Sequence, residues 1–378
     1  MKTSSIRQSA TIGFFKQTDF LILVPILVTL AIGLSVLSRL LAMNAASNYP
    51  KNMIVQGGSV LIGLVLMFTI MKIGVRKIQH FGWILYGLSL ILQLLLPIFG
   101  DKSLARATGS NSWLRLPLIG SVQPSELAKV ALFILVSYYL DAIKRGQYRY
   151  PRGFGYIACL CIPQLLLILG YQSDVGTAFV IILSLVAMLF VWGIKLSYIA
   201  ITFSAFVFSL PIIWFYFLAE FRKKRIISFL YPQLDPQAAY NVNQAKRAIL
   251  SGGLTGNKTG HFVHVPVQES DFIFTAVAEY MGLIGTATLV ICLFAFIMRA
   301  IYVASRSRTH AERYMATGIT TMFAVHTIQN IGMCLGFLPV TGIPLPFVSQ
   351  GGTAMLNNCI AAGVLLAIAS ERYRWDKW

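Results

Sequence analysis

Charged residues are scarce in this chain, and acidic residues are the scarcest of all. Asp and Glu together number 13 among 378 residues, and all charged residues make up only 12%. An average soluble domain carries about 25% charged residues. This composition, with 57% hydrophobic residues and a mean hydropathy of +0.71, excludes a soluble globular protein and predicts one that lies in a membrane.

Cysteine is also rare, and common signatures of metal and nucleotide sites are missing. The five cysteines all fall inside apolar segments, so the sequence predicts no disulfide framework. The glycine-rich stretch Gly252–Gly260 lacks the Walker spacing, because Asn257 separates its glycine from the lysine. His261 and His264 have no HExxH motif around them and are interpreted as ordinary loop histidines.

Long apolar runs are what the chain has in abundance. A membrane-spanning helix needs about 20 mostly apolar residues. Ten segments qualify: 20–42, 53–74, 81–99, 125–143, 154–171, 176–194, 197–219, 272–300, 314–337 and 352–370. We therefore predict an all-α polytopic membrane protein in which residues 1–378 form a single domain. The first segment is expected to stay as an anchor, because its apolar run is longer than the core of a signal peptide.

The basic residues orient the predicted helices. They gather in the loops on one side, and cytoplasmic loops are the ones enriched in Lys and Arg. Ten spans then place both termini in the cytoplasm. They also place a long polar loop, about 220–271, outside the cell between the seventh and eighth spans. Because the charges sit in short loops between helices, the net charge of +18 indicates membrane topology and not a nucleic-acid partner.

Five ionisable residues lie near the outer ends of the predicted spans. Glu126 and Lys129 share the fourth span, Asp174 precedes the sixth, and Asp271 opens the eighth. Glu279 follows Asp271 by eight residues, which predicts a position about 12 Å deeper in a straight helix. Ionisable residues in membrane segments are costly to bury and often mark functional sites. Their location on one side predicts a polar cavity open to the outer leaflet.

Each of these residues also has a structural interpretation. Glu126 and Lys129 lie one helical turn apart and could form an ion pair that holds helices together. Asp174 and Asp271 each precede a predicted helix, where Asp is a preferred N-cap residue. The spacing of the residues leaves both interpretations open.

Two outer segments extend this polar region. The run Arg222–Arg225 opens the long loop and is interpreted either as a diphosphate site or as an amphipathic surface segment. The segment Pro339–Gly352, between the ninth and tenth spans, is rich in proline, glycine and apolar residues. It is predicted to be rigid, non-helical and folded back into the protein, where it either lines a substrate cavity or forms a plain turn.

Five motifs, taken together and in order, are highly specific. They are Gln123–Lys129, Gln172–Ala178, Ser251–Gly256, Ser270–Phe274 followed by Glu279 and Gly282, and the Pro339–Gly352 segment, which contains Ser349. Over essentially its whole length the chain resembles the SEDS family (shape, elongation, division and sporulation), and within it the RodA branch more than the FtsW branch. Val267, Tyr280 and Gln350 depart from the family pattern. Val267 and Tyr280 replace acids common in the family, so an auxiliary acid or metal ligand beside Asp271 is not expected.

The resemblance implies a peptidoglycan glycosyltransferase with ten helices in the bacterial cytoplasmic membrane and an outward-facing site, serving cell-wall elongation and cell shape. The implied substrate is lipid II, a disaccharide-pentapeptide on undecaprenyl diphosphate. The implied partner is a class B penicillin-binding protein, a transpeptidase that cross-links the new strands. The family's essential acid falls on Asp271. The residues expected to bind substrate or support the site are Gln123, Glu126, Lys129, Asp174, Glu279 and Ser349.

The expected chemistry suits these residues. A sugar hydroxyl must lose a proton as it attacks an anomeric carbon, and Asp271 is the candidate general base. The diphosphate leaves without protonation, so its charge must be offset by basic side chains or by a divalent cation such as Mg²⁺ or Mn²⁺. Two alternative functions are a lipid II flippase and a non-catalytic scaffold of the cell-wall synthesis complex. A flippase usually shows inverted repeats and broken helices, and no repeat is visible in the sequence.

Overall fold

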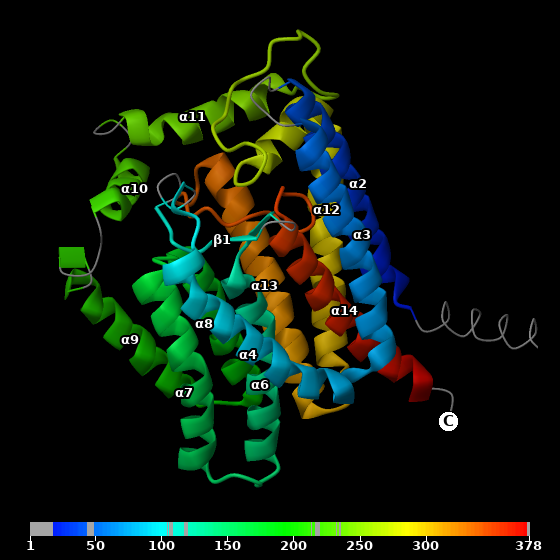
Figure 1. Cartoon of the computed structure of the whole chain (residues 1–378), viewed down its shortest axis with the longest axis vertical. Helices are drawn as coiled ribbons and strands as arrows, with labels where there is room; N and C mark the ends of the chain where they lie inside the picture. The colour runs from blue at the N-terminus through cyan, green and yellow to red at the C-terminus, as the bar shows by residue number, and fades with distance from the viewer. Residues whose placement is uncertain are drawn as a thin grey trace, which may run out of the picture.

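The protein folds as a bundle of long helices (Figure 1). The computed structural model describes residues 18–43, 49–103, 105, 109–116, 120–212, 214–215, 220–231, 233 and 236–375. The helices are α2 (Phe20–Met43), α3 (Tyr49–Ile73), α4 (Val75–Phe99), α6 (Pro124–Lys144), α7 (Tyr150–Leu166) with the π-helix η1 (Leu167–Tyr171), α8 (Val175–Trp192), α9 (Leu196–Ile212), α10 (Glu220–Leu230), α11 (Pro236–Ser251), α12 (Ile273–Ser305), α13 (His310–Leu335) and α14 (Gly352–Trp375). A short antiparallel hairpin joins β1 (Leu114–Leu116) to β2 (Gly120–Val122) just before α6.

Each of the ten predicted spans coincides with one of the described helices, which confirms an all-α polytopic fold. Seven have the length and apolarity to cross a membrane, namely α2, α3, α4, α7 with η1, α8, α12 and α14. The other three are α6, α9 and α13. Several boundaries differ from the prediction: α4 begins at Val75 and α12 continues to Ser305. Residues 213 and 216–219 of the predicted seventh span lie outside the described residues.

Two less apolar helices, α6 and α13, run through the middle of the bundle. Every residue from Ala128 to Ser137 on α6 is buried. α4 packs along α6, α8 along α13, α12 along α2, and α14 along α3. Because their polar side chains meet one another inside the protein, α6 and α13 can be less apolar than helices that face lipid.

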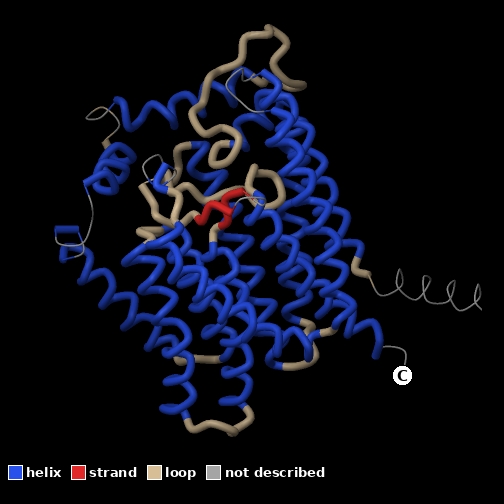
Figure 2. Tube along the Cα trace, in the orientation of Figure 1, coloured by secondary structure: helices blue, strands red, loops and turns tan. Residues whose placement is uncertain are grey.

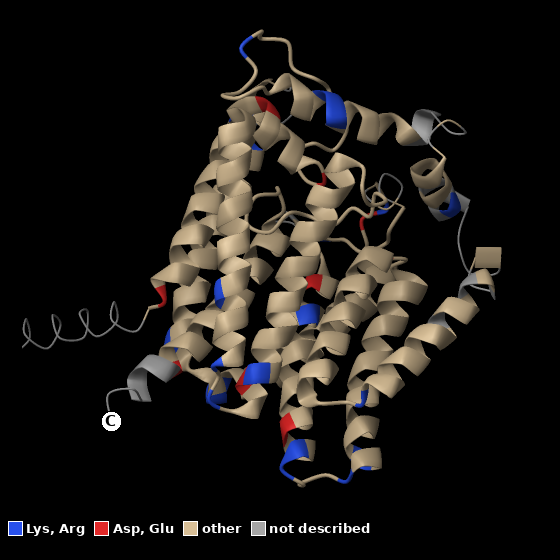
Figure 3. Ribbon diagram, turned by 180° about the vertical axis from the view of Figure 1, so that it is seen from behind, with Lys and Arg blue, Asp and Glu red and all other residues tan. Residues whose placement is uncertain are grey.

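The two ends of the bundle differ in structure and charge. Loops, the β-hairpin, α10 and α11 gather at one end, which we name the loop end (Figure 2). Lys and Arg are concentrated at the opposite end, which we name the basic end (Figure 3). It includes the exposed turn between α6 and α7, with Lys144, Arg145 and Arg149. The predicted polar loop at 220–271 is therefore partly helical, because it contains α10 and α11.

The α12 helix is broken at Gly282, whose φ of 65° and ψ of −164° lie outside the helical region. The glycine-rich segment after α11 bonds the backbone groups freed by this break. The Leu283 N–H donates to the Gly253 carbonyl at 2.8 Å, and the Asn257 N–H donates to the Glu279 carbonyl at 2.8 Å. A helix break in a membrane protein is tolerated where protein groups satisfy the freed backbone.

Glycine is required where this segment touches α12. A Cβ atom at Gly252 would collide with the carbonyl of Ala278, and one at Gly256 with the carbonyl of Tyr280. The two backbones are therefore in direct contact, which only glycine permits. The Gly252–Gly260 stretch thus serves to pack the outer segment on α12.

Candidate functional site

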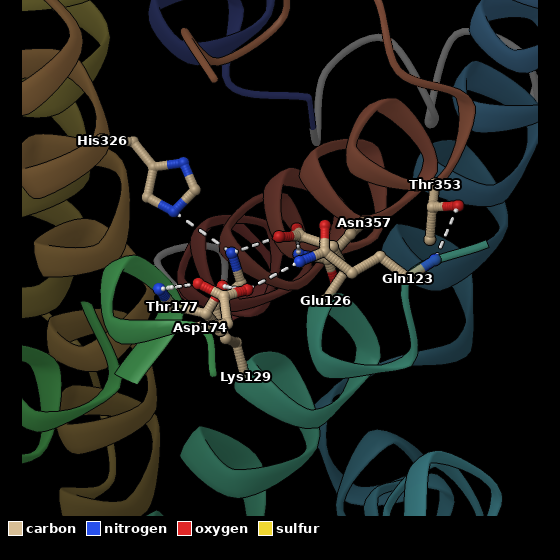
Figure 4. Close-up of polar contacts among 8 residues, drawn as sticks. All are labelled: Gln123, Glu126, Lys129, Asp174, Thr177, His326, Thr353 and Asn357. Carbon is tan, nitrogen blue, oxygen red and sulfur yellow. Dashed lines mark hydrogen bonds and ion pairs between the residues drawn. The ribbon is translucent and has the colours of Figure 1, made fainter. Parts of the chain in front are cut away.

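A buried ion pair lies on α6, at the centre of the bundle. The Lys129 ammonium donates to Glu126 Oε1 at 2.7 Å, and the two side chains are 1% and 3% exposed. On its other side the ammonium lies 3.1 Å from His326 Nε2 of α13. Asn357 of α14 donates to the second oxygen of Glu126 at 3.3 Å. Figure 4 shows Lys129 between Glu126 and His326.

These contacts fix the protonation of the His326 ring. An ammonium group has only donors, so Nε2 accepts from Lys129, and the other ring nitrogen carries the proton of a neutral imidazole. The arrangement joins α6, α13 and α14 around one compensated pair of charges. Such a pair holds helices together mainly because removing either partner would leave a buried charge alone.

Asp174 caps α8, as the structural interpretation of the sequence predicted. Its Oδ1 accepts from the Thr177 N–H at 2.9 Å, and its Oδ2 accepts from the Thr177 hydroxyl at 2.8 Å. Oδ2 also accepts from Gln123 Nε2 at 2.9 Å, which connects the start of α6 to the start of α8. Both Gln123 and Asp174 are partly exposed. Figure 4 shows Gln123 and Asp174 joined by this bond beside the buried Glu126–Lys129 pair. We name these two partly exposed side chains the polar surface of Gln123 and Asp174.

Asp271 lies in the turn that precedes α12 and is partly exposed. The N-cap residue of α12 is Phe272, so Asp271 lies one position before the cap. Its backbone carbonyl accepts from Asn330 Nδ2 of α13 at 2.7 Å. Its carboxylate lies beside Gly342: a Cβ added there would be 3.4 Å from Asp271 Oδ2. Gly342 is itself exposed and has no side chain to cover the carboxylate.

Ser349 fastens the Pro339–Gly352 segment to the turn that carries Asp271. Its hydroxyl donates to the Ser270 carbonyl at 2.6 Å and accepts from the Leu345 N–H at 2.8 Å. The adjoining Val348 backbone touches α2 at mid-length, since a Cβ added to Gly33 would lie 2.9 Å from Val348 Cα. Ser349 is 5% exposed. Ile343 and Leu345–Ser349 are buried, while Gly342 is exposed, so only the second part of the segment is enclosed by protein. Ser349 acts there as a fastening residue.

The depth predicted for Glu279 is wrong, because Asp271 is the deeper of the two acids. Asp271 follows Ser270, which bonds Ser349, and the adjoining Val348 touches Gly33 on α2. Tyr280, next to Glu279, instead places its hydroxyl 3.1 Å from the sulfur of Met43, the last residue of α2. Gly33 and Met43 are ten residues apart, which is about 15 Å along a helix. The first part of α12 therefore runs from Asp271 toward the loop end.

The second part of α12 runs the opposite way. Beyond the break at Gly282 it reaches the basic end, where Arg299 forms a bidentate ion pair with Asp19 at the start of α2, with a shortest distance of 2.7 Å. The portion that crosses the bundle therefore begins at Leu283, not at 272 as predicted. The prediction assumed a continuous helix, and the break at Gly282 invalidates that assumption.

Glu279 holds the outer segment in place. Its Oε1 accepts from the Val263 N–H at 2.7 Å and from the Ser251 hydroxyl at 3.1 Å. The side chain is 1% exposed. Buried behind the glycine-rich segment, Glu279 is suited to supporting the loop end rather than to contacting a substrate.

Backbone strain marks the same region. Among the described residues, three that are not glycine have positive φ: Ser173 at 58°, Val267 at 57° and Phe347 at 64°. Ser173 directly precedes Asp174, Val267 begins the turn that ends at Asp271, and Phe347 lies two residues before Ser349. A positive φ is a clear outlier for a branched or bulky residue and is often found at functional sites. The sequence departure at Val267 thus falls on a strained turn.

The Thr341–Ile343 turn lies between the two partly exposed aspartates. A Cβ added to Gly176, in the first turn of α8, would lie 3.2 Å from the Thr341 carbonyl. The next residue, Gly342, faces the Asp271 carboxylate. The structure therefore brings Asp174 and Asp271 to the two sides of one turn, while it buries Glu126, Lys129 and Glu279 in separate contacts.

Two residues of this region escaped the sequence analysis. His326 and Asn330 lie four residues apart on α13, hence on one face, and both are buried. The signal was present in the sequence, because polar residues at this spacing within an apolar span indicate a face turned toward other polar groups.

The basic residues of the outer segment are only partly described. Arg222–Arg225 lies in α10, but the side chains of Arg222, Lys224 and Arg225 lie outside the described residues. Lys246 of α11 lies against Gly336, the residue that ends α13. A cation there is favoured by the partial negative charge of a helix C-terminus. Lys246 therefore has a structural role in docking α11.

Comparison with known proteins identifies the family. Residues 19–374 match the cell cycle protein family of FtsW, RodA and SpoVE. The chain belongs to this family. The peptidoglycan glycosyltransferase MrdB of Escherichia coli K12 is 31% identical over 359 residues, covering 93% of this chain and 95% of that protein. The probable peptidoglycan glycosyltransferase FtsW of Geobacter metallireducens is 31% identical over 84% of each chain, and stage V sporulation protein E of Bacillus subtilis is 31% identical over 82% and 84%.

Solved structures confirm the fold. A chain from a peptidoglycan synthase complex, described as coordinating polymerization and crosslinking, superposes with a TM-score of 0.76 at 24% identity over 94% of this chain and 99% of that one. The rod shape determining protein RodA of Thermus thermophilus gives 0.67 at 23% identity over 94% and 98%. The protein is thus a multi-pass bacterial membrane protein of the SEDS type, as the sequence motifs predicted.

Proposed function

We propose that this protein polymerises lipid II into glycan strands at the outer face of the cytoplasmic membrane, with Asp271 as general base, in cell-wall elongation. Relatives that align over more than nine-tenths of its length carry the name peptidoglycan glycosyltransferase, and the protein is an enzyme of that class. The substrate, the base and the side of the membrane are the parts that we propose.

The position of Asp271 is the observation that carries the proposal. It is a partly exposed residue whose backbone is held by a buried amide and whose side chain adjoins an exposed glycine. Glu126 and Glu279, by contrast, are at most 3% exposed. A base must come within hydrogen-bonding distance of the hydroxyl that it deprotonates. Of these three carboxylates, Asp271 has that access.

The reaction requires one proton to be removed. A hydroxyl oxygen of the acceptor sugar attacks the anomeric carbon of the donor, the new glycosidic C–O bond forms, and the bond from that carbon to the diphosphate breaks. Asp271 takes the hydroxyl proton, and the lipid diphosphate departs with the electron pair. A well-placed base contributes about 10²- to 10⁴-fold to such a step.

The polar surface of Gln123 and Asp174 is proposed to bind the substrate's polar groups. Both side chains are partly exposed, and they lie across the Thr341–Ile343 turn from Asp271. Lys129, at 1% exposure, is better placed to support that surface through Glu126 and His326 than to touch the substrate.

A divalent cation is proposed only in association with the diphosphate. Among the described residues there is no group of three or more His, Cys, Asp or Glu side chains that could hold a metal ion. Mg²⁺ commonly binds through substrate phosphates and water with one or two carboxylates, and the partly exposed Asp174 is the carboxylate proposed for that role. Bound there, the cation would offset charge on the leaving diphosphate.

A class B penicillin-binding protein is the proposed partner, supported by the likeness to a chain of a peptidoglycan synthase complex. Small residues of the eighth and ninth spans permit close approach of a partner helix, and we predict contacts at Gly282, Gly285, Ala287 and Gly318. Three of these four are not available. Gly318 packs inside the bundle against Met188 and Phe133. Gly285 is buried, and Gly282 lies against the glycine-rich segment. Ala287 is exposed, so it is the one of the four that a partner helix can contact.

The break in α12 is a feature that a lipid II flippase, the alternative function, would also show. Broken helices are common in transporters, where the freed backbone groups bind the substrate, and α12 is broken at Gly282. Here the outer segment bonds those groups instead. The backbone groups at this break therefore hold the outer segment in place.

An assay with purified protein separates the three functions. Lipid II is incubated with the protein in detergent, and the products are resolved on a gel. A glycosyltransferase yields glycan polymer, and Asp271→Asn yields none. A flippase yields no polymer but moves labelled lipid II across proteoliposomes, and a scaffold does neither. Absence of polymer with the wild-type protein and its transpeptidase partner together would refute the proposal.

A further inference from the structure

Asn330 is a fully buried amide at the junction of two irregular segments. It lies on α13, and its exposed fraction is 0%. Its Nδ2 donates to the Asp271 carbonyl at 2.7 Å and to the Ile343 carbonyl at 2.8 Å. A side-chain amide has two N–H donors, so each hydrogen is used in one of these bonds.

The two acceptors belong to the two segments that place the Asp271 carboxylate. One is the backbone of Asp271 itself. The other is the Thr341–Ile343 turn, whose Gly342 lies beside Asp271 Oδ2. Asn330 therefore sets the position of the carboxylate relative to the exposed turn. Two backbone carbonyls that face one donor group would otherwise repel each other and be left without partners in a buried place.

The same helix face connects this junction to the buried ion pair. His326 lies one turn before Asn330 and contacts the Lys129 ammonium. α13 thus presents two successive polar side chains to the interior: His326 contacts the ion pair, and Asn330 contacts the Pro339–Gly352 segment. Of the two, Asn330 is the one that reaches Asp271.

We propose that Asn330 is a positioning residue for the reaction, holding Asp271 and the Thr341–Ile343 turn in the geometry that proton transfer requires. This inference rests on the proposed function, because it presumes that Asp271 is the base. Asn330 does not contact the reacting atoms. Its effect is exerted through the Asp271 backbone and should appear in the turnover rate rather than in substrate binding.

The neighbouring residue provides a matched control. Gln329 also donates from α13 to this segment, to the Pro339 carbonyl at 3.0 Å, and it is 7% exposed. Gln329→Ala removes one amide bond between the same helix and the same segment. If such bonds served only to hold the segment in place, Asn330→Ala and Gln329→Ala would have similar effects.

The test measures kcat and KM for lipid II and the melting temperature for Asn330→Ala, Asn330→Asp and Gln329→Ala. Asn330→Asp keeps the shape of the side chain but replaces the donor with an acceptor. Displacing a catalytic group by about 1 Å costs on the order of 100-fold in rate. We expect kcat to fall by about that factor in both Asn330 variants, with KM changed less than about threefold. Gln329→Ala should keep near-normal kcat.

A double-variant comparison separates a positioning effect of Asn330 from a loss of folding. In an Asp271→Glu background, where the carboxylate is already displaced by one methylene, Asn330→Ala should lower kcat far less than in the wild-type background. Equal losses in the two backgrounds would overturn the inference, as would near-normal kcat in Asn330→Ala or equal losses in Asn330→Ala and Gln329→Ala. If Asp271→Asn itself remains active, the proposed function fails. If Asp271→Asn is inactive while Asn330→Ala turns over normally, only the role of Asn330 fails.

Discussion

The Glu126–Lys129 pair and Asp271 belong to one region of the molecule, yet they are held in opposite ways. Glu126 and Lys129 lie on a regular helix, are almost fully buried, and bond to side chains of two further helices. Asp271 lies on an irregular turn and is partly exposed, and its backbone is fastened by Asn330. The charges of the pair are compensated inside the protein, while Asp271 is partly exposed and its carboxylate adjoins the exposed Gly342.

The difference separates a structural use of charge from a chemical one. A compensated buried pair resists change, because altering one partner leaves the other uncompensated in a medium of low dielectric. A reactive carboxylate needs the reverse, a rigid backbone with an accessible side chain. The structure supplies the rigidity by joining Asp271 to α13 and to the Pro339–Gly352 segment.

Asp271→Asn should have the largest effect on activity. Asn keeps the size of Asp but cannot accept the hydroxyl proton, so polymerisation should fall by about 10²- to 10⁴-fold. Expression, membrane insertion and the melting temperature should stay near those of the wild type. A gel-based lipid II assay measures the rate, and scanning fluorimetry measures stability. A near-normal rate would show that the side chain of Asp271 has only a structural role.

Lys129→Met tests the structural role of the Glu126–Lys129 pair. It leaves the Glu126 carboxylate buried without its cation, which typically costs about 3–5 kcal/mol of stability. The melting temperature should drop steeply, and activity should fall with the folded fraction. The double variant Glu126→Gln/Lys129→Met should recover much of the stability. If Lys129→Met instead melts normally but binds lipid II weakly, Lys129 contacts the substrate.

Gly282→Ala should disturb the backbone break in α12, the helix that follows Asp271. Its φ of 65° and ψ of −164° are in a region that is strained for other residues, which costs about 1–3 kcal/mol. An added Cβ would also lie 2.5 Å from the Leu254 carbonyl carbon. We expect a lower melting temperature and weaker polymerisation. Gly87→Ala is the control, because a Cβ there meets nothing within 4 Å; equal effects of the two variants would argue against a special role for the break.

Glu279→Gln should have the smallest effect and completes the comparison of carboxylates. The amide oxygen can still accept from the Val263 N–H and the Ser251 hydroxyl, so the loss is that of charge-assisted bonding, about 1 kcal/mol. Polymerisation should remain within a few fold of wild type while the melting temperature decreases slightly. A loss of rate as large as that of Asp271→Asn, at normal stability, would move the base to Glu279.

The sequence by itself determined the architecture and the candidate residues. Ten apolar runs predict ten helices because a long apolar segment has no favourable place except a membrane or a core, and the helix is the form that satisfies its own backbone there. The positions of Asp174 before α8 and of Glu126 and Lys129 one turn apart offered a cap and a pair as one of two interpretations, because both are local interactions along one helix. The ordered motifs indicated the family, which the match over residues 19–374 confirms.

Only the tertiary structure decided how the acids are used. Local spacing predicts Glu279 to be deeper than Asp271, but the break at Gly282 reverses the order, and that break is stable because a segment distant in sequence bonds the freed backbone. His326 and Asn330 acquire partners on α6 and on two loops that no local pattern connects. Whether a carboxylate is buried and paired or accessible depends on which segments meet around it. The contacts between these segments are long-range in sequence. They form only when the whole bundle packs, so no local sequence pattern predicts them.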